Sequence, residues 1–133
     1  MDNKKGEKVS EIEKYLKELK SVIQTDLDTY KNDFKIRAIY ERYFEKIIEA
    51  VIDLAFIIIK EKNLKIPEDE ESSFKILKNE GIISESLSER LSQAKGMRNL
   101  IAHEYGKIDD ELVFKAVTQE IIVDVDEFLE AVA

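Results

Sequence analysis

Apolar residues recur along most of this chain at intervals of three and four positions, the spacing that places them on one face of an α-helix. The stretches with this spacing are residues 8–30, residues 32–62, residues 74–79, a run that starts at Ser84, and a last run from Asp109 or Asp110 to the C-terminus. No stretch shows the strict alternation of a half-buried strand. The pattern therefore predicts an all-α fold, a single antiparallel bundle of about five helices that forms one domain over residues 1–133.

The stretch at residues 32–62 carries two parallel rows of apolar side chains. A helix that is apolar on two sides contacts more than one neighbour. It is therefore the centre of the bundle, or it contributes to the core and to a dimer seam together. Its longest apolar run, AVIDLAFIII at residues 50–59, contains Asp53 and is far shorter than the ~20 residues of a membrane-spanning helix. We expect a buried helix and no membrane span.

Local signals predict where the shorter helices begin and end. Ser72 is expected to cap the helix at residues 74–79, and Gly81 to close it. Ser84 is expected to start the next helix, which Gly106 would end.

Composition narrows the class of protein. Hydrophobic residues make up 44% of the chain and charged residues 38%, which favours a soluble, helix-rich protein. The chain has no cysteine, so it has no disulfide and no thiolate metal site, and its charged first residues do not form a leader. A cytoplasmic location is expected. The net charge of −8 argues against broad, nonspecific binding of polyanions, so any attraction for nucleic acid must be local.

Candidate chemistry is concentrated in MRNLIAHEYG, residues 97–106, which contains the chain's single histidine, His103. Arginine offers a planar fork for phosphate oxygens, and histidine can exchange a proton near neutral pH. Arg98 lies five residues earlier, about 1.4 helical turns, so the two side chains converge only if the helix frays after Ala102 or if they come from different subunits. The plainer interpretation is that His103 caps helix carbonyls and Arg98 faces water.

The segment RNLIAHEY has the form R-x4-H-x-Y and resembles the signature of the HEPN superfamily, and within it the HepT-like toxins of HEPN/MNT toxin–antitoxin modules. The similarity extends beyond the motif. IRAIYERYFEKIIEAVIDLAFIII, from Ile36, is similar to the family's second helix, and FKILKNEGIISESLSERLSQAKGMRNLIAHEYGKID to the rest of its core. Together these segments cover roughly residues 34–110.

This resemblance implies a metal-independent endoribonuclease that acts as a homodimer on RNA and needs no cofactor. Arg98 and His103 would be the catalytic residues, in two motifs that face each other across a cleft between subunits, and Asn99 would be a supporting polar residue. Tyr105 would be modified with AMP units by the partner, an MNT-type nucleotidyltransferase antitoxin. The alternatives are a non-catalytic HEPN protein that binds a nucleotidyltransferase and a nucleotide, and a structural helical adaptor.

The chemistry of RNA cleavage favours a dimer independently of the resemblance. When the ribose 2′-hydroxyl is the nucleophile, one group must accept its proton and another must protonate the leaving 5′-oxygen. The chain supplies one histidine, His103, and a two-fold interface supplies a second. The expected products are a 2′,3′-cyclic phosphate and a 5′-hydroxyl.

Two acidic residues, Glu49 and Asp53, lie four positions apart on an otherwise apolar helix. Such carboxylates commonly face water or pair with a nearby basic side chain. We expect them to position Arg98 rather than to take part in catalysis, with Asp53 as a supporting residue.

Overall fold

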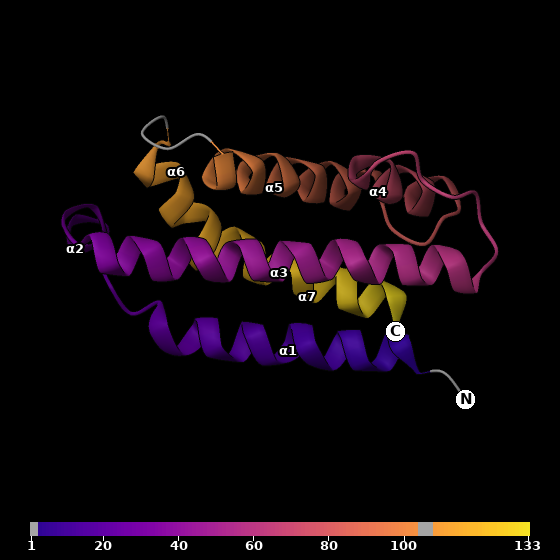
Figure 1. Ribbon diagram of the computed structural model, residues 1–133, viewed down its shortest axis with the longest axis horizontal. Coiled ribbons are helices and arrows are strands. Elements are labelled where there is room, and N and C mark those ends of the chain that lie inside the picture. Colours follow the sequence, from indigo (N-terminus) through magenta and orange to yellow (C-terminus); the bar gives the residue numbers. More distant parts are fainter. Residues whose placement is uncertain (1–2, 104–107) are drawn as a thin grey trace.

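The computed structural model describes residues 3–103 and 108–133, and in this part of the chain every regular element is a helix (Figure 1). The elements are α1 (Lys4–Val22), α2 (Leu27–Asn32), α3 (Phe34–Glu61), α4 (Glu70–Asn79), α5 (Glu85–His103), α6 (Asp110–Lys115), a π-helical segment η1 (Ala116–Glu120) and α7 (Ile121–Val132). The predicted all-α fold is confirmed.

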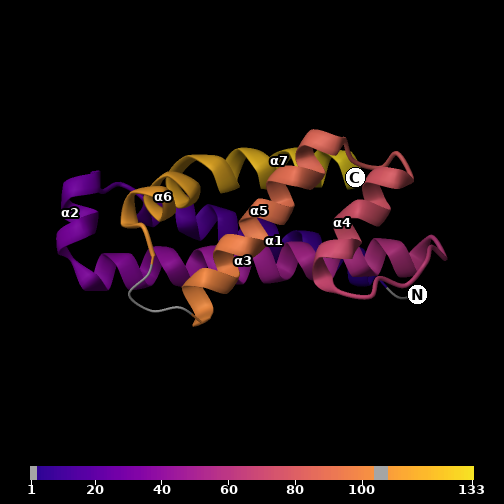
Figure 2. The same cartoon turned by 90° about the horizontal axis from the view of Figure 1, so that it is seen from above.

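The long helix α3 is the centre of the bundle. It contacts α1, α4, α5 and α7, and α1 runs antiparallel beside it (Figure 1). Seen from above, α5 crosses α3 obliquely, with α4 beside the start of α5 (Figure 2). Helix α3 carries two apolar rows because it has neighbours on more than one side. The prediction that this helix is the centre of the bundle is confirmed. The dimer seam stays a prediction.

Buried side chains form one hydrophobic cluster that extends through all these helices. Helix α3 alone contributes eleven buried residues, among them Ile47, Val51 and Leu54 with no exposed surface. Within this cluster, Phe74 of α4 meets Phe128 of α7 edge-on, with ring centroids 6.3 Å apart. Close packing of this kind makes α3 a rigid support for the helices that cross it.

The first helical stretch differs from the prediction, because α1 ends at Val22 and α2 starts anew at Leu27. The carboxylate of Asp26 accepts a hydrogen bond from the backbone N–H of Thr29 at 2.8 Å. This cap starts a second, separate helix. The apolar spacing alone does not reveal the break before it.

The predicted cap of α4 was also wrong. The helix begins at Glu70, and Asp69 caps it by accepting from the N–H of Ser72 at 2.8 Å. Gly81 follows the helix with a φ of +74°, in the left-handed region that suits glycine, as predicted for the closing residue. The predicted end at Gly106 lies outside the described residues.

The last helix is continuous from Asp110 to the C-terminal residues, as its pattern predicted, but it contains the unpredicted π-helical segment. Asp109 caps it through the N–H groups of Glu111 and Leu112. Ser84 accepts a hydrogen bond from the N–H of Leu87 at 3.1 Å and so starts α5, as expected. The starts of α5 and of the last helix therefore both follow ordinary N-capping rules.

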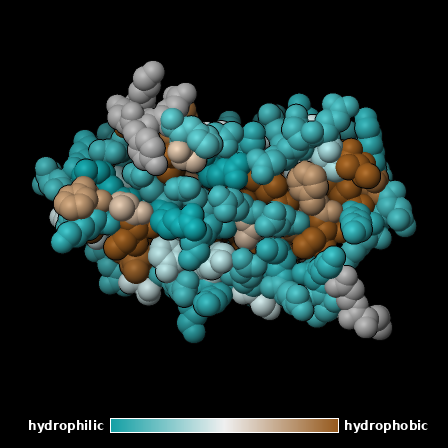
Figure 3. Space-filling model, viewed as in Figure 1, coloured by the Kyte–Doolittle hydropathy of each residue, from teal (hydrophilic) through white to brown (hydrophobic). Residues whose placement is uncertain are grey.

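The visible surface is largely hydrophilic, with apolar side chains in separate groups (Figure 3). Among the described residues, no helix is long and apolar enough to cross a membrane.

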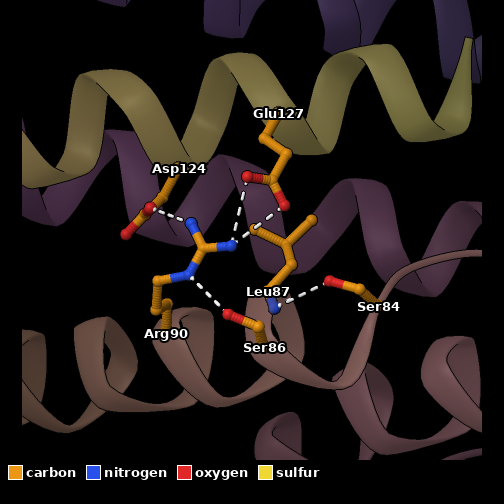
Figure 4. Close-up of polar contacts among 6 residues, drawn as sticks. All are labelled: Ser84, Ser86, Leu87, Arg90, Asp124 and Glu127. Carbon is orange, nitrogen blue, oxygen red and sulfur yellow. Dashed lines mark hydrogen bonds and ion pairs between the residues drawn. The ribbon is translucent and has the colours of Figure 1, made fainter.

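Arg90 ties α5 to α7 with a forked set of contacts (Figure 4). One guanidinium nitrogen pairs with Asp124, the other lies 3.0 Å from a Glu127 oxygen, and Nε donates to the Ser86 hydroxyl at 3.3 Å. The hydrogen bonds to Glu127 and Asp124 raise the pKa of Arg90 above its ordinary value. These contacts join α5 to α7.

Replacing Arg90 by Ala should therefore lower the free energy of unfolding by roughly 1–2 kcal/mol, because charged hydrogen bonds are lost at a partly solvent-screened site. Urea denaturation would measure the change. Glu89→Ala, at the exposed neighbouring position, is the control and should shift stability by less than about 0.5 kcal/mol. Equal stability of the Arg90 variant and the wild type would contradict this role.

Candidate active site

The position of Arg98 follows from the apolar stripe of α5. Leu87, Leu91 and Ile101 are buried against the bundle. Arg98 is seven residues after Leu91 and three before Ile101, so it lies on this same inward stripe. Only 12% of its side chain is exposed, and the interpretation of Arg98 as a solvent-facing residue is therefore wrong.

Two carboxylates from neighbouring helices meet the Arg98 guanidinium. Its Nη2 donates a hydrogen bond to Glu70 Oε1 of α4 at 2.5 Å. Its Nη1 lies 3.9 Å from Glu49 Oε1 of α3, at the outer limit of an ion pair. Nε is buried and has no hydrogen-bond partner in the described part of the chain. Arg98 thus joins α5 to both helices beneath it.

The supporting acidic residues were only partly anticipated. Glu49 approaches Arg98 as expected, but the Asp53 carboxylate is 60% exposed and pairs with Lys8 of α1 at 3.4 Å. Four residues along α3 amount to about 6 Å of rise and only about 40° of net rotation, so Asp53 lies on nearly the same face as Glu49 but one turn further along, where it pairs with Lys8. Sequence reasoning missed Glu70, whose only signal was its place in the acidic cluster after Pro67.

His103 is the last residue of α5, and its side chain is exposed. The helix continues through Ala102 to His103, so the fraying that would let Arg98 and His103 converge within one copy is not observed. Because five residues turn a helix by about 140° beyond one full turn, Arg98 and His103 project from different sides of α5. Asn99, next to Arg98, is half-buried. Tyr105 lies outside the described residues.

The site combines the Arg98 guanidinium, which lies beside two carboxylates, with the exposed imidazole of His103. Arg98 donates a hydrogen bond to Glu70, and Glu49 lies further away, so a phosphate that approaches the guanidinium shares it with Glu70. A groove of about 370 Å³ lies beside the motif, between α5 and the C-terminal helix. Of the described motif residues 97–103, Met97 lies in its wall, together with Phe44, Ile48, Gln119 and others. In the described residues, no group of three or more His, Asp or Glu side chains could hold a metal ion.

An all-helical bundle that carries R-x4-H near the end of a long helix defines the chain as a HEPN-type protein. The chain belongs to the Ribonuclease HepT-like family, which it matches over residues 12–132. This confirms the family that the motif indicated.

Named relatives agree with this assignment. The chain is 27% identical to the mRNA nuclease HepT of Shewanella oneidensis, over 94% of this chain and 92% of that protein. It is 32% identical to the tRNA nuclease HepT of Aphanizomenon flos-aquae, over 80% of this chain and 73% of that protein. A solved structure of the tri-AMPylated Shewanella oneidensis HEPN toxin, in complex with its MNT antitoxin, superposes with a TM-score of 0.90. That likeness covers 99% of this chain and 98% of the toxin at 26% identity.

Proposed function

We propose that this protein is the endoribonuclease toxin of a HEPN/MNT toxin–antitoxin module. One observation carries the proposal. In this HepT-like protein, a single helix holds both an arginine fixed by a hydrogen bond and, at its end, an exposed histidine. The two relatives named as HepT nucleases and the toxin seen with its MNT antitoxin support the same class of activity.

The proposed site is shared by two copies of the chain. Within one copy, Arg98 and His103 project from different sides of α5, and only one imidazole is present. A two-fold interface that brings the ends of two α5 helices together supplies two imidazoles and two guanidinium groups to one cleft. Asn99, half-buried beside Arg98, is a supporting polar residue at this interface.

The cleavage step then needs no group from outside the dimer. One His103 accepts the proton of the ribose 2′-hydroxyl as its oxygen forms a bond to phosphorus. The bond from phosphorus to the 5′-oxygen breaks, and the second His103 supplies a proton to that oxygen. Arg98 stabilises the charge that builds on the phosphorane oxygens. The products are a 2′,3′-cyclic phosphate and a 5′-hydroxyl.

Cleavage by this mechanism should persist when divalent metals are removed. The purified protein, assayed on RNA with excess EDTA, is expected to retain its rate and to leave 2′,3′-cyclic phosphate ends. A metal-dependent ribonuclease treated in parallel is the control for chelation. Activity that appears only after a divalent metal is added would contradict the mechanism.

We further propose that the partner nucleotidyltransferase inactivates the toxin by attaching AMP to Tyr105. The Tyr105 oxygen would bond to the α-phosphorus of ATP, pyrophosphate would leave, and the phenolic proton would pass to a base. The nucleotide bonded to Tyr105 places a negative phosphodiester and a bulky base two residues from His103. Both effects oppose the entry of RNA into the cleft.

A second candidate is a non-catalytic HEPN protein that binds a nucleotidyltransferase and a nucleotide. The net charge of −8 and the two carboxylates at Arg98 favour it, because both work against RNA binding. Expression in cells separates the two candidates. Growth arrest by the wild type that disappears with Arg98→Ala indicates cleavage, and no arrest by the wild type indicates binding.

A further inference from the structure

We propose that Glu70 is a positioning residue for Arg98: it holds one corner of the guanidinium so that the other edge is presented to the scissile phosphate. This inference rests on the proposed ribonuclease function. It starts from the unequal contacts that the two carboxylates make with Arg98.

The contact with Glu70 is the strong one. Nη2 of Arg98 lies 2.5 Å from Glu70 Oε1, and the arginine side chain is 12% exposed. A charge-assisted hydrogen bond to a mostly buried guanidinium is stronger and better directed than an ion pair in water. Glu70 can therefore fix the orientation of the Arg98 head group.

The contact with Glu49 is the weak one. Its oxygen lies 3.9 Å from Nη1, beyond hydrogen-bond distance, and its side chain is 50% exposed. The Nη1 side of the guanidinium consequently keeps its N–H groups for another acceptor. A phosphoryl oxygen is an acceptor that the planar guanidinium group suits well.

Glu70 is itself held on a rigid support. It is the first residue of α4, which Asp69 caps from the preceding position. Phe74 and Leu77, on the same helix, are completely buried in the bundle core. Because α4 is held in the core, Glu70 holds the Arg98 guanidinium of α5 at a fixed place relative to α4. Without this anchor the guanidinium would no longer be held in one orientation, and the reacting geometry would be formed less often.

The first arm of the test measures steady-state cleavage by the full-length protein. Glu70→Ala should lower kcat by roughly 10- to 100-fold with little change in KM, because a displaced Arg98 stabilises the transition state less well. Glu70→Gln should fall between Glu70→Ala and the wild type, since its amide oxygen still accepts from Nη2. Glu71→Ala is the matched control, at the exposed next position of the same turn, and should keep wild-type kcat.

A double variant separates positioning from a general effect on folding. In the Arg98→Ala background, Glu70→Ala should cause no further loss of kcat, because Glu70 acts through Arg98. If Glu70→Ala lowers kcat equally with and without Arg98, or not at all in the wild type, the proposal is overturned.

The second arm does not depend on activity. The buried Nε–H of Arg98 should give an observable ¹H–¹⁵N NMR signal with a high heteronuclear NOE in the wild type. Glu70→Ala should lower that NOE and Glu71→Ala should not. An unchanged NOE in Glu70→Ala would overturn the positioning role. If the wild type cleaves no RNA, the ribonuclease proposal fails, and this second arm still decides whether Glu70 orders Arg98.

Discussion

Replacement of His103 by Ala is expected to lower the rate of RNA cleavage by roughly 10²- to 10⁴-fold, the usual contribution of a general acid or base. In the proposed cleft the substitution removes both proton-transfer groups at once, because each comes from a copy of the same residue. The measurement is the single-turnover cleavage rate of the purified variant. The fold should survive, because the His103 side chain is exposed at the end of α5.

Stability provides the control for this result. The free energy of unfolding should change by less than about 0.5 kcal/mol, as for most exposed positions away from the core. A His103→Ala protein that is folded and still cleaves RNA at the wild-type rate would remove His103 from the mechanism.

Substitution of Tyr105 by Phe should leave cleavage largely intact and abolish neutralisation by the partner nucleotidyltransferase. Phenylalanine keeps the ring but lacks the oxygen that would bond to the α-phosphorus. Cells that express the variant with the partner enzyme should therefore arrest as if the partner were absent. Intact-protein mass spectrometry should show added AMP units on the wild type and none on the variant.

A second tyrosine gives a matched control for the Tyr105 substitution. Tyr43 on α3 is half-buried, and its hydroxyl donates a hydrogen bond to Glu18 at 3.3 Å. Tyr43→Phe also removes one phenolic oxygen, but it should be modified and neutralised like the wild type. Neutralisation that survives Tyr105→Phe would place the modification elsewhere.

Much of the fold could be predicted because burial follows helical periodicity. The two apolar rows of α3 correctly indicated a central helix, and the stop at Gly81 followed from local backbone preference. The break between α1 and α2 could not be predicted from helical periodicity. The apolar spacing continues across it, and only the Asp26 cap marks the new helix.

The candidate site was predictable where it depends on the motif and unpredictable where it depends on tertiary contacts. Arg98 and His103 could be selected from the sequence, and the stripe through Leu91 and Ile101 explains why Arg98 faces inward. The bond from Arg98 to Glu70 joins residues 28 positions apart on separate helices, so no local pattern reports it. For the same reason, the sequence predicted Arg98 as the partner of Asp53, whereas the structure pairs Asp53 with Lys8.

The central claim, that two His103 side chains serve one phosphodiester, can be tested by mixing subunits. Wild-type and His103→Ala chains would be co-expressed with different tags, and cleavage would be measured as the wild-type fraction varies. If both copies are needed, activity follows the square of that fraction, so equal amounts give about one quarter of the wild-type activity under random pairing. Activity in direct proportion to the wild-type fraction, about one half at equal amounts, would show that each copy works alone and would contradict the account.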